Sequence, residues 1–148
     1  MTLSRSQKYK SISWNEIKCY AKDGKKENFP SARIGRTFSM IGSNVFLFGG
    51  IEENEQTTPK NDLFVLHLQN RENIWARLNT AGQQPPGRWN HTASHVSVFD
   101  ILIFGGFTSI TGRLNDFWIF NTITKSWRKV LLKSTLRGDL IQLMCAII

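Results

Sequence analysis

One four-part signature occurs twice, in the same order, in this chain of 148 residues. Each copy has a proline and an arginine, then a short apolar run that ends in Gly-Gly, then Asn-Asp before apolar residues, and finally a tryptophan. The first copy comprises Pro30, Arg33, residues 45–50, residues 61–64 and Trp75, and the second comprises Pro86, Arg88, residues 101–106, residues 115–118 and Trp127. The diglycines lie 56 residues apart and the tryptophans 52 apart. Similarity at a fixed period of this size is typical of a stacked-repeat fold.

The apolar runs before the two diglycines predict strands rather than helices. Residues 45–48 and 101–104 are rich in β-branched and aromatic residues and are stopped at once by Gly-Gly. A strand that is apolar on both sides is covered on both faces, as it is in a propeller blade packed between two other blades. The diglycines are expected to have positive φ angles and to let neighbouring backbone approach closely.

Three further kinds of segment complete the predicted strand pattern. Residues 62–68 and 116–120 are expected to form third strands, and residues 74–78 and 126–130, which carry the tryptophans, fourth strands. Residues 12–17, around Trp14, resemble a leading fourth strand without a blade of its own. First strands are expected to begin after Arg33 and Arg88. The sequence therefore predicts an all-β fold, a partial β-propeller of two four-stranded antiparallel blades, about 33–78 and 88–131, plus an extra N-terminal strand.

The ends of the chain differ in composition from the segment at 13–131. The net charge of +8 is concentrated before the first repeat, and we expect residues 1–12 to form a solvated basic tail. Contact of this basic arm with nucleic acid or acidic lipid is the alternative. Residues 132–148 form an atypical apolar C-terminal tail that is too short to span a bilayer.

The cysteines and the N-terminal sequence bear on the compartment. Cys19 and Cys145 lie near opposite ends, so no disulfide framework or zinc module is indicated. No apolar secretory segment is present near the start. A cytoplasmic location is expected, with the nucleus as an alternative.

Taken together, the repeated residues resemble kelch repeats, across roughly residues 13–131. The resemblance implies a four-stranded antiparallel blade per repeat and a propeller that serves mostly as a protein-binding platform. The positions that match the repeat signature are Arg33, Gly49, Gly50, Asp62, Trp75, Arg88, His91, Gly105, Gly106, Asp116 and Trp127. The histidine position of the family is His91 in the second copy, but Arg36 in the first.

The pattern changes after Trp127, where no further proline, Phe-Gly-Gly or tryptophan follows. We interpret this as a propeller interrupted after two blades, from a truncated gene product or a splice form. Repeats cannot bury their faces alone. The isolated chain is therefore expected to be marginally stable or to self-associate through exposed blade faces.

The predicted function is that of a protein–protein interaction module, a scaffold or adaptor that binds an unidentified protein through its interblade loops. The candidate partner-binding residues are Arg36, which departs from the repeat pattern, and Glu52, Glu53, Lys60 and Arg113, which lie in loops 51–60 and 107–113. Arg33 and Arg88 are expected to bond carbonyl groups of a neighbouring blade, with recognition of an acidic peptide as the alternative.

No catalytic residue, cofactor or metal site is predicted. Some kelch-like propellers are copper radical oxidases that use tyrosine ligands, but Tyr9 and Tyr20 both precede the first blade. The alternative function is a fragment of a kelch-type propeller enzyme, oxidase or specifier-like, whose catalytic residues are missing.

Overall fold

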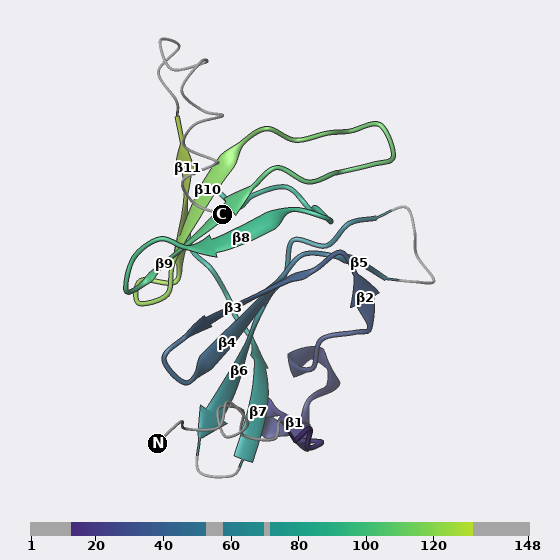
Figure 1. Ribbon diagram of the computed structural model, residues 1–148, viewed down its shortest axis with the longest axis vertical. Coiled ribbons are helices and arrows are strands. Elements are labelled where there is room, and N and C mark those ends of the chain that lie inside the picture. The colour runs from purple at the N-terminus through teal and green to yellow at the C-terminus, as the bar shows by residue number, and fades with distance from the viewer. Residues whose placement is uncertain (1–12, 53–57, 70–71, 132–148) are drawn as a thin grey trace, which may run out of the picture.

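A computed structural model describes residues 13–52, 58–69 and 72–131, which form two antiparallel blades, one above the other in Figure 1. The first blade contains β3 (Thr37–Ile41), β4 (Asn44–Phe48), β6 (Leu63–Gln69) and β7 (Glu72–Arg77). The second contains β8 (Thr92–His95), β9 (Asp100–Phe104), β10 (Phe117–Asn121) and β11 (Ser126–Val130). The predicted all-β partial propeller with two four-stranded antiparallel blades is confirmed.

Smaller elements surround the first blade. β1 (Cys19–Ala21) lies beside β7, and β2 (Arg33–Ile34) pairs with β5 (Ile51–Glu52) in a separate two-stranded sheet. Two short 3₁₀ helices, η2 (Lys22–Gly24) and η3 (Lys26–Asn28), connect β1 to the residues before β2. No helix in the described ranges is long and apolar enough to cross a membrane.

The main core lies between the two blades, because strand alternation directs one face of each sheet toward the other. Aromatic rings join the blades: Phe48 lies 4.9 Å from Trp127 and Phe46 lies 6.0 Å from Phe120, between ring centroids. The core residues of the first blade are Phe46, Phe48, Leu63, Val65 and Ala76, and those of the second are Ile101, Ile103, Trp118, Phe120 and Trp127. We call the core side of the first blade its downstream face and the core side of the second blade its upstream face.

The opposite, upstream face of the first blade carries a second buried cluster of Leu47, Phe64, Leu66 and Trp75. The segment that leads into the blade covers part of it. Phe29 packs edge-on against Trp75 with ring centroids 6.4 Å apart, and the Arg33 guanidinium lies 5.6 Å from the centre of the Phe64 ring.

An extra N-terminal strand is present, but its predicted position at residues 12–17 is wrong. Residues 13–17 have no assigned strand, and Trp14 is 95% exposed. The corresponding Trp75 and Trp127 are buried against other strands and rings, whereas in the described residues no sheet is in place to receive Trp14. The strand that forms is β1, which runs parallel to β7 with Tyr20 opposite Ile74.

The connection into the second blade behaves in the same way as β1. Ala81 forms a parallel bridge with Ser126 of β11, and it exchanges backbone hydrogen bonds with Lys125 and Trp127. Each connection therefore pairs with the outer strand of the blade that it enters. Periodicity alone could not predict this pairing, since neither connection alternates polar and apolar residues as a strand does.

The diglycines behave as predicted. Gly49 and Gly50 have φ angles of 65° and 93°, and Gly105 and Gly106 have 65° and 89°. A Cβ atom on Gly49 would lie 2.5 Å from the Arg88 carbonyl oxygen, so the second blade approaches the first within a distance that only glycine permits.

Candidate functional site

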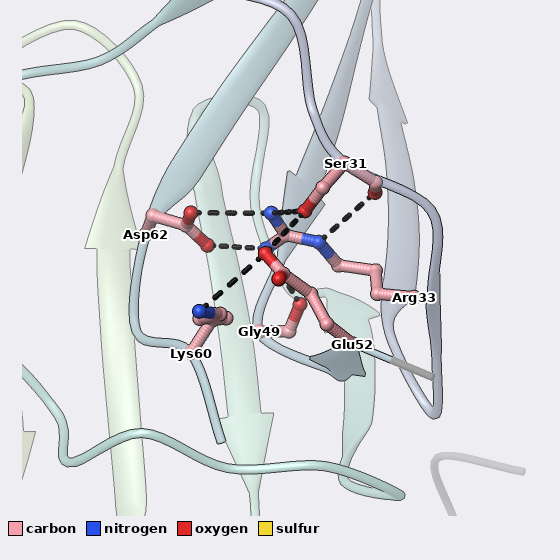
Figure 2. Close-up of polar contacts among 6 residues, drawn as sticks. All are labelled: Ser31, Arg33, Gly49, Glu52, Lys60 and Asp62. Atoms are coloured by element: carbon pink, nitrogen blue, oxygen red, sulfur yellow. Dashed lines mark hydrogen bonds and ion pairs between the residues drawn. The ribbon is translucent and has the colours of Figure 1, made fainter. Parts of the chain in front are cut away.

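A buried arginine and a carboxylate join the start of the first blade to its third strand (Figure 2). The Arg33 guanidinium donates to both carboxylate oxygens of Asp62, at 2.5 Å and 3.3 Å, and to the Gly49 carbonyl at 3.2 Å. Ser31 accepts two more of its hydrogen bonds, through its carbonyl and its hydroxyl. All these contacts lie around the diglycine turn, so the pair fixes the turn from which loop 51–60 leaves.

The second blade repeats this arrangement. The Arg88 guanidinium donates to the two oxygens of Asp116 at 2.8 Å and 3.0 Å and to the Gly105 carbonyl at 3.0 Å. Burial, the largest single influence, raises the pKa of the Asp116 carboxyl, but hydrogen bonds from Arg88 and Trp118 outweigh it. Its pKa therefore lies below the usual 3.8.

The expectation that Arg33 and Arg88 bond a neighbouring blade is wrong, since each bonds carbonyl and carboxylate groups of its own blade. The pairing with Asp62 and Asp116 was not predicted from the sequence. A signal was available: the arginine precedes the aspartate by 29 residues in one copy and by 28 in the other. An arginine and an aspartate that recur in both copies at nearly the same spacing indicate an ion pair.

His91 links the two blades. Its Nε2 atom is 2.7 Å from the Thr37 hydroxyl of the first blade, and its ring packs edge-on against Phe48. Burial and, to a smaller extent, the charge of Arg88 lower the pKa of His91 from 6.5 to about 4. The side chain is therefore neutral near pH 7 and serves as an interblade contact.

Arg36 stands at the corresponding position of the first blade and is exposed. Its guanidinium donates to the Arg33 carbonyl and lies 5.2 Å from the centre of the Phe38 ring. Without a preceding blade among the described residues, this side chain folds back over its own strand.

The other first-blade candidates lie on the same diglycine turn as Arg36. Glu52 accepts a hydrogen bond from Ser31 at 2.7 Å and forms an ion pair with Lys60 at 3.4 Å (Figure 2). The Ser31 hydrogen bond is the main cause of the lowered pKa of Glu52, and Lys60 adds to it. The structure therefore brings Arg36, Glu52 and Lys60 to one turn, while the candidate Glu53 lies outside the described residues.

Arg113 lies in the corresponding loop of the second blade, at residues 107–113, on the same side of the sheets (Figure 1). This loop is closed by hydrogen bonds: Thr108 N–H donates to the Gly112 carbonyl at 2.8 Å, and Gly112 N–H donates to the Ser109 hydroxyl at 2.9 Å. At its tip Ile110 is 89% exposed. Ile110 was not among the residues predicted from the sequence, although one aliphatic residue among Ser, Thr, Gly and Arg was a usable signal.

The candidates thus divide into two kinds. The signature arginines, aspartates, glycines and tryptophans hold the blades, whereas Arg36, Arg113 and Ile110 reach solvent. Within the described parts of the chain, no group of three or more His, Cys, Asp or Glu side chains is placed to hold a metal ion.

Comparison with known proteins agrees with this geometry. The family model for the KLHDC2/KLHL20/DRC7 Kelch-repeats domain matches residues 7–139. The host cell factor of Drosophila melanogaster is 31% identical over 134 residues, covering 80% of this chain and 9% of that protein. Host cell factor 1 of Homo sapiens is 33% identical over 130 residues, covering 78% of this chain and 6% of that protein.

Two more similarities concern a plant protein and a solved structure. Adagio-like protein 3 of Oryza sativa subsp. japonica is 37% identical over 101 residues, covering 67% of this chain and 15% of that protein. The solved structure of YjhT has a TM-score of 0.55 and 17% identity, covering 69% of this chain and 39% of its own, and shows the fold alone. The chain spans no more than 15% of the three curated relatives named. The matched family model, the repeated arginine–aspartate pairs and the two diglycine turns agree: this chain belongs to the kelch-repeat family.

Proposed function

We propose that this chain is a protein-interaction module that binds a partner through the loops between the second and third strands of its blades. Loop 107–113 forms the centre of the surface, with Ile110 as the apolar anchor and Arg113 beside it. Arg36, which lies beside the diglycine turn of the first blade, adds a second positive charge.

The presentation of Ile110 carries this proposal. An isoleucine that is 89% exposed gains from burial, and its loop is already held by three hydrogen bonds within residues 108–112. A preordered loop loses little conformational entropy on binding, so more of the burial energy contributes to affinity. A few apolar or arginine anchors commonly dominate an interface.

The local charges indicate what surrounds the anchor on the partner. Glu52 already interacts with Lys60 and Ser31, whereas Arg36 and Arg113 are exposed residues for which the described part of the chain shows no carboxylate partner. An arginine fork suits a carboxylate, with two parallel hydrogen bonds. The partner surface is therefore an apolar pocket flanked by Asp or Glu side chains.

A photo-crosslinking amino acid at position 110 of the full chain, introduced in cells, tests this surface. We expect a discrete crosslinked protein that is lost when Arg113→Glu is added. Val98 supplies the matched control position, because it is also exposed but lies in the loop between β8 and β9, at the opposite end of the second blade.

The crosslinked protein, once identified, allows a direct affinity measurement. Ile110→Asp is expected to weaken binding by about 10- to 100-fold, as loss of an interface anchor does. Equal crosslinking from positions 98 and 110, or unchanged affinity of Ile110→Asp, would contradict the proposed surface.

A further inference from the structure

The outer face of each blade corresponds, residue for residue, to a face that is packed inside the molecule. On the upstream face of the second blade, Ala93 packs against the interblade core and the preceding His91 contacts the first blade. The residues at these places in the first blade are Phe38 and Arg36. Phe38 is 52% exposed and Met40, two residues on, is 59% exposed. The upstream face of the first blade is thus a packing surface that the described residues cover only in part.

The downstream face of the second blade has the complementary character. In the first blade this face presents Phe46, Phe48, Leu63 and Val65, all buried against the second blade. Their counterparts in the second blade are Leu102, Phe104, Phe117 and Ile119, which are only half-buried. Phe104 and Phe117 stack with ring centroids 4.4 Å apart, so this face is an ordered apolar surface.

Backbone groups at the two outer faces match as well. Inside the molecule, Gly50 N–H of the first blade donates to the Arg88 carbonyl of the second at 2.8 Å. The counterpart of this donor is Gly106 N–H, for which the described part of the chain supplies no acceptor. The counterpart of the acceptor is the Arg33 carbonyl, which receives the Arg36 guanidinium instead of a backbone N–H.

We propose that copies of this chain associate head to tail, with the downstream face of the second blade of one copy on the upstream face of the first blade of the next. The occupant is a second copy because the chain itself carries both halves of an interface that it already forms internally. In the intermolecular contact, Phe104 and Thr92 of one copy take the places that Phe48 and Thr37 have inside the molecule. Arg36 of the next copy takes the place of His91. A guanidinium–aromatic contact between Arg36 and Phe104 therefore replaces the histidine–aromatic contact between His91 and Phe48.

This contact is heterologous, which gives it a distinctive behaviour. Each copy keeps one downstream and one upstream face, so addition continues until the rotation between copies closes a ring or the copies form an open chain. The proposal uses the blade faces, and Arg36 is the residue that it shares with the loop surface proposed above.

Sedimentation velocity on the full chain over a range of concentrations tests the proposal. We expect the wild-type mass to rise with concentration above that of a single chain. Phe38→Arg places a charge on the upstream face and Thr92→Arg places one on the downstream face, and both side chains are exposed, so the fold of one chain is not disturbed. Each is expected to weaken association by about 100-fold, because an unpaired charge is desolvated at the contact.

Mixing the two variants gives the decisive result. The downstream face is unaltered in Phe38→Arg, and the upstream face is unaltered in Thr92→Arg. These two unaltered faces can meet, so the mixture is expected to form dimers while each variant alone is monomeric. Ile123→Arg, at an exposed turn of the second blade, is the matched control and is expected to assemble like the wild type. A wild type that is monomeric up to its solubility limit, a Thr92→Arg variant that still dimerises alone, or a control that also dissociates would overturn the proposal.

Discussion

At the scale of single residues, the two arginine–aspartate pairs are more deeply buried than the Lys60–Glu52 ion pair. Arg88 is fully buried, and its fork is matched by two carboxylate oxygens and a carbonyl within 3.0 Å. A buried ion pair contributes little net stability when it is complete, but breaking it leaves an uncompensated charge. Substitutions that change the donor geometry should therefore cost more than those that move charge on the surface.

Arg88→Lys is expected to lower the free energy of unfolding by about 2 kcal/mol or more, because an ammonium group cannot donate in parallel to both Asp116 oxygens. Urea unfolding of the variant and the wild type measures the difference. Arg128→Lys, at an exposed position of β11, is the matched control and should change the value by less than about 0.5 kcal/mol. Equal behaviour of the two variants would show that the bidentate pair is unimportant.

His91 should make stability depend on pH between about 4 and 6.5. Its pKa is lowered to about 4 in the folded chain, so as the pH falls below 6.5 the unfolded state takes up a proton first. This contribution to stability is complete above pH 6.5 and falls toward pH 4, by roughly 3 kcal/mol. The lowered pKa of Asp116 acts in the same direction, but only below its usual value of 3.8.

Urea unfolding at several pH values for His91→Gln checks this expectation. Glutamine places a neutral polar group near Thr37 and should remove most of the slope between pH 6.5 and 4. His95→Gln changes an exposed histidine at the end of β8, four residues after His91, and should keep the wild-type slope. A slope that survives in His91→Gln would mean that another group is responsible.

At the scale of elements, the diglycine turns set how closely the blades approach. Gly49 combines a positive φ with the nearby Arg88 carbonyl, whereas Gly42, in the turn between β3 and β4, has a φ of 59° and open space around its Cα. The two glycines therefore separate backbone strain from steric exclusion.

Gly49→Ala is expected to destabilise the chain by about 3 kcal/mol, from left-handed strain and a clash with backbone of the second blade. Gly42→Ala carries the strain alone and should cost about 1 kcal/mol. Thermal or urea unfolding of both variants measures the difference. If the two costs are equal, the close approach of Arg88 is relaxed at no cost by small backbone shifts.

Much at the element scale could be predicted from sequence, and the exceptions share a physical cause. Local residue preferences, which can be read from the sequence, predict the strands around 45–48 and 101–104. They also predict the φ angles of the diglycines. The position of β1 and the burial of Arg33 against Asp62 depend on what lies opposite in the folded chain. Trp14 shows this dependence, because the residue type that is buried at positions 75 and 127 is 95% exposed at 14.

At the scale of the whole molecule, the two blades share one hydrophobic core. Residues from both sheets make up the larger cluster, and Phe120 of the second blade lies against Phe46 of the first. Neither blade can lose its neighbour without exposing aromatic rings. We therefore expect the described region to unfold as one cooperative unit rather than blade by blade.

Phe120→Ala should lower the free energy of unfolding by about 3 to 5 kcal/mol through the cavity it leaves. The most stable amides of β4 and β6 should lose hydrogen-exchange protection by a similar amount, although they belong to the other blade. Ile119→Ala, on the opposite and half-buried face of the same strand, should have a smaller effect. Unchanged protection in the first blade would show that the blades unfold independently.

The parallel pairing of each incoming connection with the fourth strand has a consequence for how such repeats multiply. β1 occupies the hydrogen-bonding edge of β7, and Ala81 begins to occupy that of β11. An open strand edge invites pairing with other chains and aggregation. Because the covering residues come just before the blade that they protect, duplication of a connection together with its blade adds a repeat whose outer edge is already shielded.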